Sequence, residues 1–149
     1  MIVMGCDKAG TEWLPLISEK LNQMGLANEI VFDGTQDGCD YTDAAFKVAE
    51  LVACGKAEKG ILVCGTGIGM SMAANKVRGI RASVCGDCYS AKMTVVHNNS
   101  NVLCMGARVL GIELGLKIVE EYFSAEFEVG GRHERRVNAI IAKENEQLK

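Results

Sequence analysis

A glycine-rich turn around one cysteine carries the strongest chemical signal in the sequence. Cys64-Gly65-Thr66-Gly67-Ile68-Gly69 follows an apolar run and precedes a segment with helical periodicity. Glycines at alternate positions let the main chain turn sharply and point successive N–H groups into one hollow, and a following helix adds the positive end of its dipole. Such a turn suits a phosphate group, or an oxygen that becomes negatively charged during a reaction.

Two common phosphate-binding patterns do not fit this turn. The P-loop pattern GxxxxGK(S/T) is absent, and Met70 stands where the dinucleotide-binding pattern GxGxxG requires glycine. Asp87 follows about 20 residues further on, which is the spacing of the acidic residue that binds a ribose in dinucleotide sites. A nucleotide site therefore stays open as an alternative.

Cys64 stands at the head of the turn, where a helix N-terminus and free amides favour a thiolate. It could act as a nucleophile or a base, or it could be a small buried hydrophobic residue at a strand end. Cys85-Gly86-Asp87-Cys88 is a second cysteine pattern, typical of thiol–disulfide exchange or of half a zinc site. A closed zinc site needs two further ligands, and no second pair has matching spacing, so two structural cysteines are favoured.

Two histidines are present, and both stand among polar residues beside expected helices. His97 begins the run His97-Asn98-Asn99, and the second histidine lies within residues 130–136, between Arg132 and Arg136. On a helix, two arginines four residues apart share one face, and paired guanidinium groups suit a phosphate. A solvated charged face is the alternative.

Two aspartate-containing turns add polar candidates. Asp7 could accept hydrogen bonds from sugar hydroxyls, or it could cap the next helix. Tyr41, within Asp40-Tyr41-Thr42-Asp43, could face a cleft, or the segment could be a capping turn from which Thr42 starts a helix.

Short apolar runs alternate with amphipathic segments along the chain. Strands are expected at residues 2–5, 27–32, 60–64, 80–85 and 101–105. Helices are expected at residues 13–24, from 42 to about 55 with Ala45, Phe46, Val48, Ala49 and Val52 buried, and at 70–76, 90–97, 112–123 and 134–147. This repetition predicts a Rossmann-like, doubly wound α/β sheet of about five parallel strands with helices on both faces. Ligands bind beyond the carboxyl ends of such strands, so each following loop is a candidate site.

The composition narrows the class of protein. The 149 residues are expected to form one domain, with a charged tail or packing arm from about residue 143. A hydrophobic fraction of 48% with one proline excludes a disordered chain, and the net charge of −3 argues against nucleic-acid binding. Neither a membrane-spanning run nor a secretion signal is recognised, so the seven cysteines are expected to be reduced thiols in a cytoplasmic protein.

Segments in order through nearly the whole chain resemble the family of type B ribose-5-phosphate isomerases and galactose-6-phosphate isomerase subunits. They are residues 5–10, 40–43, 60–76, 79–82, 97–102, 106–108 and 130–136. The Cys-Gly-Thr-Gly-Ile-Gly-Met-Ser core and the Gly-Gly-Arg-His-x-x-Arg end are the most specific. The resemblance implies a homodimer or a dimer of dimers with active sites shared across the interface, and no metal or organic cofactor. It also implies aldose–ketose isomerisation of a phosphorylated sugar through a cis-enediolate.

The resemblance assigns a role to each candidate residue. Cys64 is the base, and Thr66 assists proton movement at the sugar oxygens. His97 opens the furanose ring, with Asp7 on the ring-oxygen side. The enediolate oxygen is held by the amides of Gly65, Gly67, Ile68 and Gly69, and the rest of the substrate is contacted by Lys8, Tyr41, Asn98, Arg108, Arg132 and Arg136.

The sequence departs from the family pattern at four positions. Lys8 stands where the family has histidine, Thr42 replaces proline, Val95 replaces a common arginine, and Asn99 replaces a common aspartate. Ribose 5-phosphate and ribulose 5-phosphate are the first substrate pair to expect. Galactose 6-phosphate, with a second subunit type, and other tetrose, pentose or hexose phosphates are alternatives. A non-catalytic sugar-phosphate or nucleotide sensor, and a thiol–disulfide oxidoreductase, are alternatives from other classes.

Overall fold

A computed structural model describes residues 1–147 and confirms the predicted fold class. Five parallel strands form one sheet in the order β2-β1-β3-β5-β4. The strands are β1 (Ile2–Cys6), β2 (Asn28–Phe32), β3 (Lys59–Cys64), β4 (Ala82–Val84) and β5 (Val102–Gly106). Within the described residues, the helices are α1 (Trp13–Gln23), α2 (Tyr41–Ala53), α3 (Ile68–Ala74), α4 (Cys88–Asn98), α5 (Ile112–Phe123) and α6 (Arg132–Gln147).

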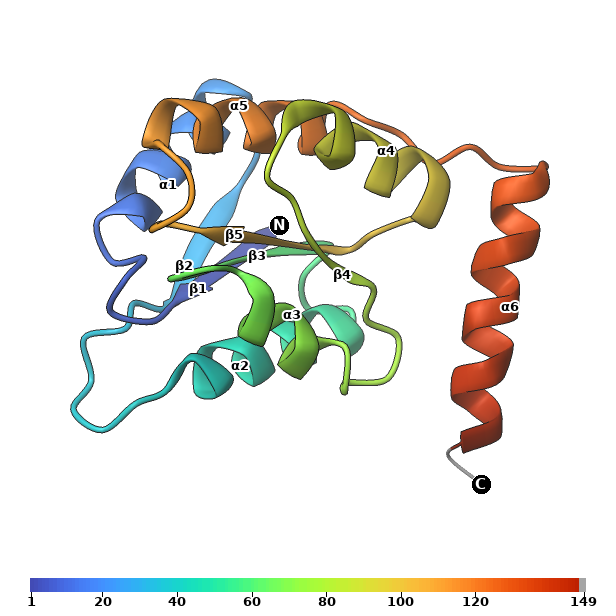
Figure 1. The fold of residues 1–149 in the computed structure, drawn as a ribbon, viewed down its shortest axis with the longest axis horizontal. Coiled ribbons are helices and arrows are strands. Elements are labelled where there is room, and N and C mark those ends of the chain that lie inside the picture. The colour runs from blue at the N-terminus through green and yellow to red at the C-terminus, as the bar shows by residue number, and fades with distance from the viewer. Residues whose placement is uncertain (148–149) are drawn as a thin grey trace.

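The sheet lies between two layers of helices. Helices α1, α4 and α5 cover one face, and α2 and α3 cover the other (Figure 1). Each face has its own hydrophobic cluster, and every residue of β1 and β5 is buried. Continuous apolar sequences such as Ile61-Leu62-Val63 form the central strands because side chains on both faces of these strands are covered.

The strand order places a topological switch point at the carboxyl ends of β1 and β3. These neighbouring strands are followed by helices on opposite faces, because α1 packs with one hydrophobic cluster and α3 with the other. The chain therefore leaves the sheet in opposite directions from adjacent strand ends, which is where open α/β sheets bind ligands.

Several predicted boundaries were wrong. Helix α2 is capped by Asp40 rather than started by Thr42: the Asp40 side chain accepts from the amide of Tyr41, and Asp43 completes a capping box. Phe46 was expected in the core but is 40% exposed, because the neighbouring alanines and Val48 form the buried side of α2.

The fourth strand is shorter than predicted, and α3 begins and ends earlier than predicted. β4 contains only Ala82–Val84, and α3 runs from Ile68 to Ala74 rather than over residues 70–76. Asn75 follows α3 directly, and its side chain pairs with Ala82: Nδ2 donates to the carbonyl at 2.9 Å and Oδ1 accepts from the amide at 2.8 Å. This pairing occupies the outer edge of β4 at its first residue.

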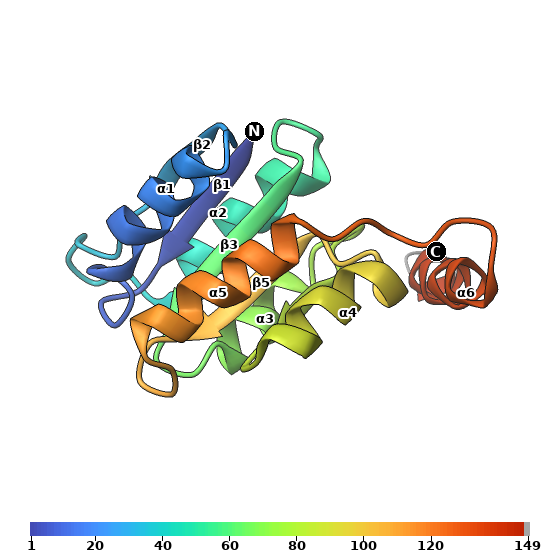
Figure 2. The ribbon, with the colours of Figure 1, turned by 90° about the horizontal axis from the view of Figure 1, so that it is seen from above.

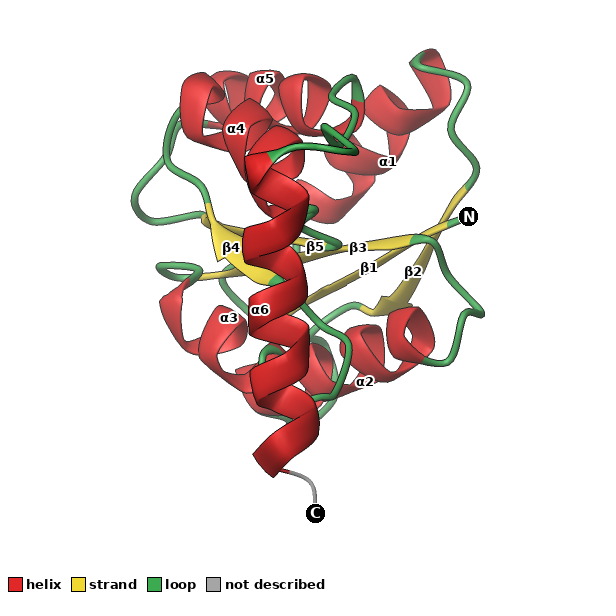
Figure 3. Cartoon of the chain, turned by 90° about the vertical axis from the view of Figure 1, so that its right-hand side faces the viewer, coloured by secondary structure: helices red, strands yellow, loops and turns green. Residues whose placement is uncertain are grey.

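Helix α6 begins at Arg132, two residues earlier than predicted, and stands apart from the two helical layers (Figure 2). Seen from its own side, it runs across the β4 edge of the sheet (Figure 3). It contacts α4, and Glu144 near its far end accepts a hydrogen bond from the amide of Gly79 at 3.1 Å. The predicted tail from residue 143 thus continues the helix, and residues 148–149 lie outside the described part. No helix within residues 1–147 combines the length and apolar character needed to cross a membrane.

Replacing Gly115 by alanine should destabilise the fold. A Cβ at Gly115, in α5, would lie 2.4 Å from Cζ3 of Trp13, in α1. Helix propensity alone would make the change stabilising by about 1 kcal/mol. Overpacking costs about 1–3 kcal/mol, and an approach of 2.4 Å belongs to the upper part of that range. We therefore expect a net loss of about 1–2 kcal/mol in the free energy of unfolding, measured by urea titration. Gly86→Ala, where a Cβ meets nothing within 4 Å, is the matched control; equal stability of the two variants would contradict this account.

Candidate active site

The turn after β3 brings a main-chain amide to the Cys64 sulfur. Cys64 ends the strand, and the amide of Gly67 donates to its Sγ at 3.1 Å. Gly67 has a left-handed backbone with φ of 78°, which turns this N–H back toward the strand end. The turn therefore places a main-chain N–H donor within hydrogen-bond distance of the sulfur that ends the strand.

Close packing against β5 fixes the shape of the turn. A Cβ on Gly67 would lie 3.0 Å from the carbonyl carbon of Met105, and a Cβ on Gly106 would lie 2.7 Å from the backbone of Thr66. The carbonyls of Cys64 and Gly65 accept from the amides of Ala107 and Arg108 at 2.8 and 3.0 Å. The glycines are therefore required by contact as well as by dihedral angle.

The other thiols near the sheet differ from Cys64. Burial raises the pKa of Cys6 and of Cys85 to about 12 and raises the pKa of Cys104 well above its usual value. These thiols are kept protonated and inert. Cys64 is also buried in one chain, at 5% exposed. Unlike the other three thiols, however, it lies at the glycine turn and its sulfur accepts a hydrogen bond from a main-chain amide.

Four more predicted residues surround the turn at the carboxyl edge of the sheet. The ring of Tyr41 lies against Gly69, where a Cβ would be 2.8 Å from Cε2. The Arg108 side chain lies over Gly65, where the corresponding distance to its Cδ is 3.5 Å. Asp7 follows β1, the neighbour of β3, and Oδ1 accepts from the amide of Ala9 at 2.8 Å. Asp7 therefore caps its own turn, and the exposed Lys8 stands beside it.

His97 lies at the opposite, amino edge of the sheet. It belongs to the last turn of α4, which leads into β5, and the amide of Gly60 near the start of β3 donates to Asn101 in this connection at 2.9 Å. Since β3 spans six residues, roughly 16 Å of strand separates the two edges. The predicted grouping of Cys64 with His97 is not formed within one chain.

His97 instead stacks on His133. The two rings are 4.1 Å apart between centroids and tilted by only 8°. His133 is in the first turn of α6 between Arg132 and Arg136, so the stack joins these exposed arginines to the end of α4. Sequence analysis gave His133 no role of its own, although the presence of just two histidines, both in specific motifs, was a signal that could have paired them.

Burial lowers the pKa of His133, and the neighbouring His97, Arg132 and Arg136 lower it further, while Glu128 raises it. The ring is therefore neutral near neutral pH. Its Nε2 accepts from Nε of Arg132 at 3.4 Å, although Oε2 of Glu128 is also within 3.5 Å. A neutral His133 places no positive charge against the His97 ring.

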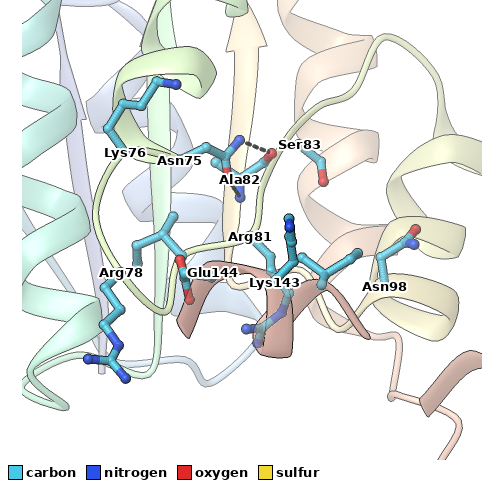
Figure 4. A pocket seen from close by; sticks show the side chains of 11 residues that line it. Asn75, Lys76, Arg78, Arg81, Ala82, Ser83, Asn98, Lys143 and Glu144 are labelled. Carbon is cyan, nitrogen blue, oxygen red and sulfur yellow. Dashed lines mark hydrogen bonds between the residues drawn. The ribbon is translucent and has the colours of Figure 1, made fainter. Parts of the chain in front are cut away.

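Asn98 is the remaining predicted residue at the amino edge. It is exposed and lines a cavity of about 650 Å³ between α6 and the connection that leads to β4 (Figure 4). Arg81, Lys143 and Glu144 line the same cavity, and Cys64 is not among its lining residues.

The structure gives the CxxC segment a structural role. Cys85 is buried, and Cys88 starts α4 after the N-cap residue Asp87. Asp87 accepts from the amide and hydroxyl of Ser90, both at 2.7 Å. It therefore caps α4, which accounts for this aspartate without the alternative of a ribose-binding residue in a nucleotide site. Across residues 1–147, no group of three metal-ligating side chains comes together.

Two departures from the family pattern now have a place in the structure. Val95 lies on the buried side of α4, where its side chain packs in the core, so it does not face the groups around His97. Asn99 has a left-handed backbone with φ of 49°, which asparagine and aspartate adopt more readily than most residues.

Comparisons with known proteins agree with this arrangement. Residues 2–140 match the family model described as Ribose/Galactose Isomerase. Ribose-5-phosphate isomerase B of Escherichia coli is 46% identical, with 96% of this chain and 95% of that protein covered. D-erythrulose-4-phosphate isomerase of Pectobacterium atrosepticum is 44% identical, with 87% and 86% covered.

A solved structure extends the likeness to three dimensions. The crystal structure of ribose-5-phosphate isomerase B from Mycoplasma genitalium with bound ribulose-5-phosphate superposes with a TM-score of 0.91 at 37% identity, over 97% of this chain and 96% of that one. The class defined by fold and comparisons is that of the sugar-phosphate aldose–ketose isomerases, which are intramolecular oxidoreductases. The chain belongs to the ribose/galactose isomerase family.

Gly67→Ala should impair catalysis more than stability. The added Cβ would strain a left-handed residue and press on Met105, displacing the amide from the Cys64 sulfur. A misplacement near 1 Å lowers turnover by about 100-fold. Gly25→Ala is the control, since Gly25 has the same left-handed backbone, with φ of 73°, in open space. We expect both variants to lose melting temperature, Gly67→Ala more because of its contact with Met105, and Gly67→Ala alone to lose turnover in the folded protein; normal turnover there would refute the role of this amide.

Proposed function

We propose that the protein interconverts ribose 5-phosphate and ribulose 5-phosphate, with Cys64 as the base that moves a proton between C2 and C1. The observation that carries this proposal is the Cys64 sulfur, which ends a central strand and accepts the Gly67 amide at 3.1 Å. Family membership and a relative solved with ribulose-5-phosphate support the substrate.

The proton transfers balance without an external acid, base or oxidant. The Cys64 thiolate takes the proton from C2 of the open-chain aldose, and the electron pair moves to form a cis-enediolate. Thr66 passes the O2 hydroxyl proton towards O1, and the thiol returns its proton to C1. A positioned base and nearby oxygen donors are the two requirements of this chemistry. Every proposed group belongs to the protein, so no cofactor or metal is required.

The amides of the turn divide between two tasks in this proposal. Gly67 already donates to sulfur, and we assign the enediolate oxygen to the amides of Gly65, Ile68 and Gly69. The Ile68 amide meets Oγ1 of Thr66 at 3.3 Å, a long contact that substrate can replace. Thr66 is exposed, which suits a residue that must contact substrate.

A second copy of the chain is needed to complete the site. The base and glycine turn occupy one edge of the sheet, whereas His97, Asn98, Arg132 and Arg136 occupy the other edge and the start of α6. Two copies related by a twofold axis can place the amino edge of one against the carboxyl edge of the other, forming two equivalent sites. In this arrangement, the half-site that contains Cys64 also contains Asp7, Lys8, Tyr41 and Arg108.

Exposed apolar side chains support this homodimer. Met72 on α3 is 64% exposed, and Tyr89 on α4 is 73% exposed. Ile68 on α3, Val84 on β4 and Ile140 on α6 are also exposed. These exposed apolar side chains of α3, β4, α4 and α6 suit burial against another subunit.

A four-carbon sugar phosphate is the second candidate substrate. A D-erythrulose-4-phosphate isomerase is 44% identical to this chain, and Lys8 replaces the family histidine beside Asp7. Lysine keeps the positive charge but has a longer and more flexible side chain, so it can hold a substrate of different length. Galactose 6-phosphate remains a third choice in the same assay.

Isomerisation in heavy water with a panel of sugar phosphates tests the reaction and the base. The wild-type protein should form ribulose 5-phosphate from ribose 5-phosphate and introduce deuterium next to the carbonyl. Cys64→Ala should lose about 1,000-fold or more in kcat, because the base is gone, while KM or the substrate Kd changes little. Proton NMR follows product and deuterium together.

Cys104→Ala is a control for cysteine loss, since Cys104 is a buried thiol on the neighbouring strand. Full activity in Cys64→Ala would show that the thiol is not the base. Failure of wild type with every four- to six-carbon sugar phosphate would overturn the proposed reaction, and preferred turnover of erythrose 4-phosphate would transfer the proposal to the four-carbon substrate.

Mixing two inactive variants tests the shared site. Cys64→Ala and His97→Ala are each expected to have low activity on ribose 5-phosphate. If each site takes Cys64 from one subunit and His97 from the other, random reassembly restores one intact site in each mixed dimer. About one quarter of wild-type activity should return, since about half of the dimers are mixed. Size-exclusion chromatography and light scattering confirm the dimer. If no activity returned after subunit exchange, Cys64 and His97 would not come from different subunits, and the shared site would be overturned.

A further inference from the structure

The connection before β4 is hydrogen-bonded to both parts of the chain that carry the amino-edge groups. Nε of Arg81 donates to the carbonyl of Asn99 at 2.8 Å, two residues beyond His97. Glu144 of α6 accepts from the amide of Gly79 through both carboxylate oxygens, at 3.1 and 3.2 Å. Residues 79–81 therefore contact the end of α4 and the helix that contains His133.

The backbone of Arg81 is held at both of its polar groups. Its amide donates to Oδ1 of Asn101 at 2.8 Å, and its carbonyl accepts from Oγ of Ser100 at 2.8 Å. The guanidinium group is held beside the Asn99 carbonyl by a second, longer contact, in which Nη1 donates to the carbonyl of Gly79 at 3.4 Å. A charged donor makes a stronger hydrogen bond to a carbonyl than a neutral donor does.

Asn99 is the residue through which Arg81 affects His97. Its left-handed backbone ends α4, and its amide donates to the carbonyl of Val95 at 3.0 Å. The orientation of the last turn of α4, which contains His97 and Asn98, thus depends on where the Asn99 peptide points. Partial burial lowers the pKa of Arg81, while Glu144 raises it, and the guanidinium group stays charged.

Residues 79–81 also limit movement of the His133 ring. His97 stacks on His133, and α6, which contains His133, is held to the connection at Glu144. Arg81, Glu144 and Asn98 line one cavity (Figure 4). The position of the His97 imidazole is therefore determined by two contacts that converge on residues 79–81.

We propose that Arg81 is a positioning residue for sugar ring opening, which holds the His97–Asn99 turn through the Asn99 carbonyl so that the His97 imidazole meets the ring oxygen of a furanose phosphate. The inference rests on the proposed function, in which His97 opens the ring and Cys64 moves the proton. It predicts that Arg81 serves the ring step and not the proton step.

Two assays separate these steps. Conversion of ribose 5-phosphate needs ring opening. Exchange of the C1 hydrogen of ribulose 5-phosphate for deuterium needs only the base, because the oxygen that would close a five-membered ring in this ketose carries the phosphate. Arg81→Met should lower kcat for ribose 5-phosphate by about tenfold or more, since an acid–base contribution is lost, while exchange falls by less than about threefold.

Arg78→Met is the matched control. Arg78 lines the same cavity, but its guanidinium group donates to Asn145 of α6 and not to the turn after His97. Both rates should stay at wild-type values in this variant. Arg81→Lys should recover part of the ring-dependent rate, because an ammonium group keeps the charge but has no planar fork. Melting temperatures of all variants are compared, and if Arg81→Met does not fold, Arg81→Lys tests the role in its place, with a smaller loss that is again confined to the ring-dependent rate.

Equal losses in the two assays, or no loss in either, would overturn the positioning role of Arg81. His97→Ala should show the same selective loss, and a His97 variant with normal ring-dependent turnover would overturn the inference while leaving Cys64 as the base. Wild-type protein inactive in both assays would instead overturn the proposed function itself.

Discussion

The hydrogen bond from the Gly67 amide to the Cys64 sulfur depends on a backbone conformation that an L side chain rarely adopts. That conformation exists because β3 and β5 run side by side and end together, with Gly106 opposite Cys64. The turn must pass within contact distance of the β5 end, so neither Gly67 nor Gly106 has room for a side chain. The close approach of the main chains at the ends of β3 and β5 therefore determines both the shape of the turn and the position of the amide beside the sulfur.

The direction of the strands has a second effect, which is to separate the functional groups. Each helix returns the chain to the amino edge, so a residue in the last turn of α4 lies far from the end of β3. A domain of this topology cannot bring these two positions together without unfolding. In the proposed dimer, association between copies brings the two edges together, and α6, which extends away from both helical layers (Figure 2), is available for contact with the other subunit.

The sequence was sufficient to predict the sheet and the glycine turn, because both depend on local patterns. Ile61-Leu62-Val63 marks a strand covered on both faces, and alternate glycines mark a sharp turn. Bonds from a side chain to distant backbone could not be predicted: Asn75 ends α3 by pairing with Ala82, and Arg81 reaches Asn99. The stack of His97 on His133 joins residues from separate helices, so no local pattern encodes it.

The pairing of Asn75 with Ala82 also bears on how the protein can assemble. An exposed edge strand normally offers its amides and carbonyls to any extended chain, and this is a common origin of aggregation. Here an amide side chain imitates the next strand at Ala82, and only a very short stretch of β4 follows. A strand added at this border would lose the pairing at Ala82 and meet only two further residues of β4, so in the proposed dimer the subunits recognise one another through side chains and not through a continuous sheet.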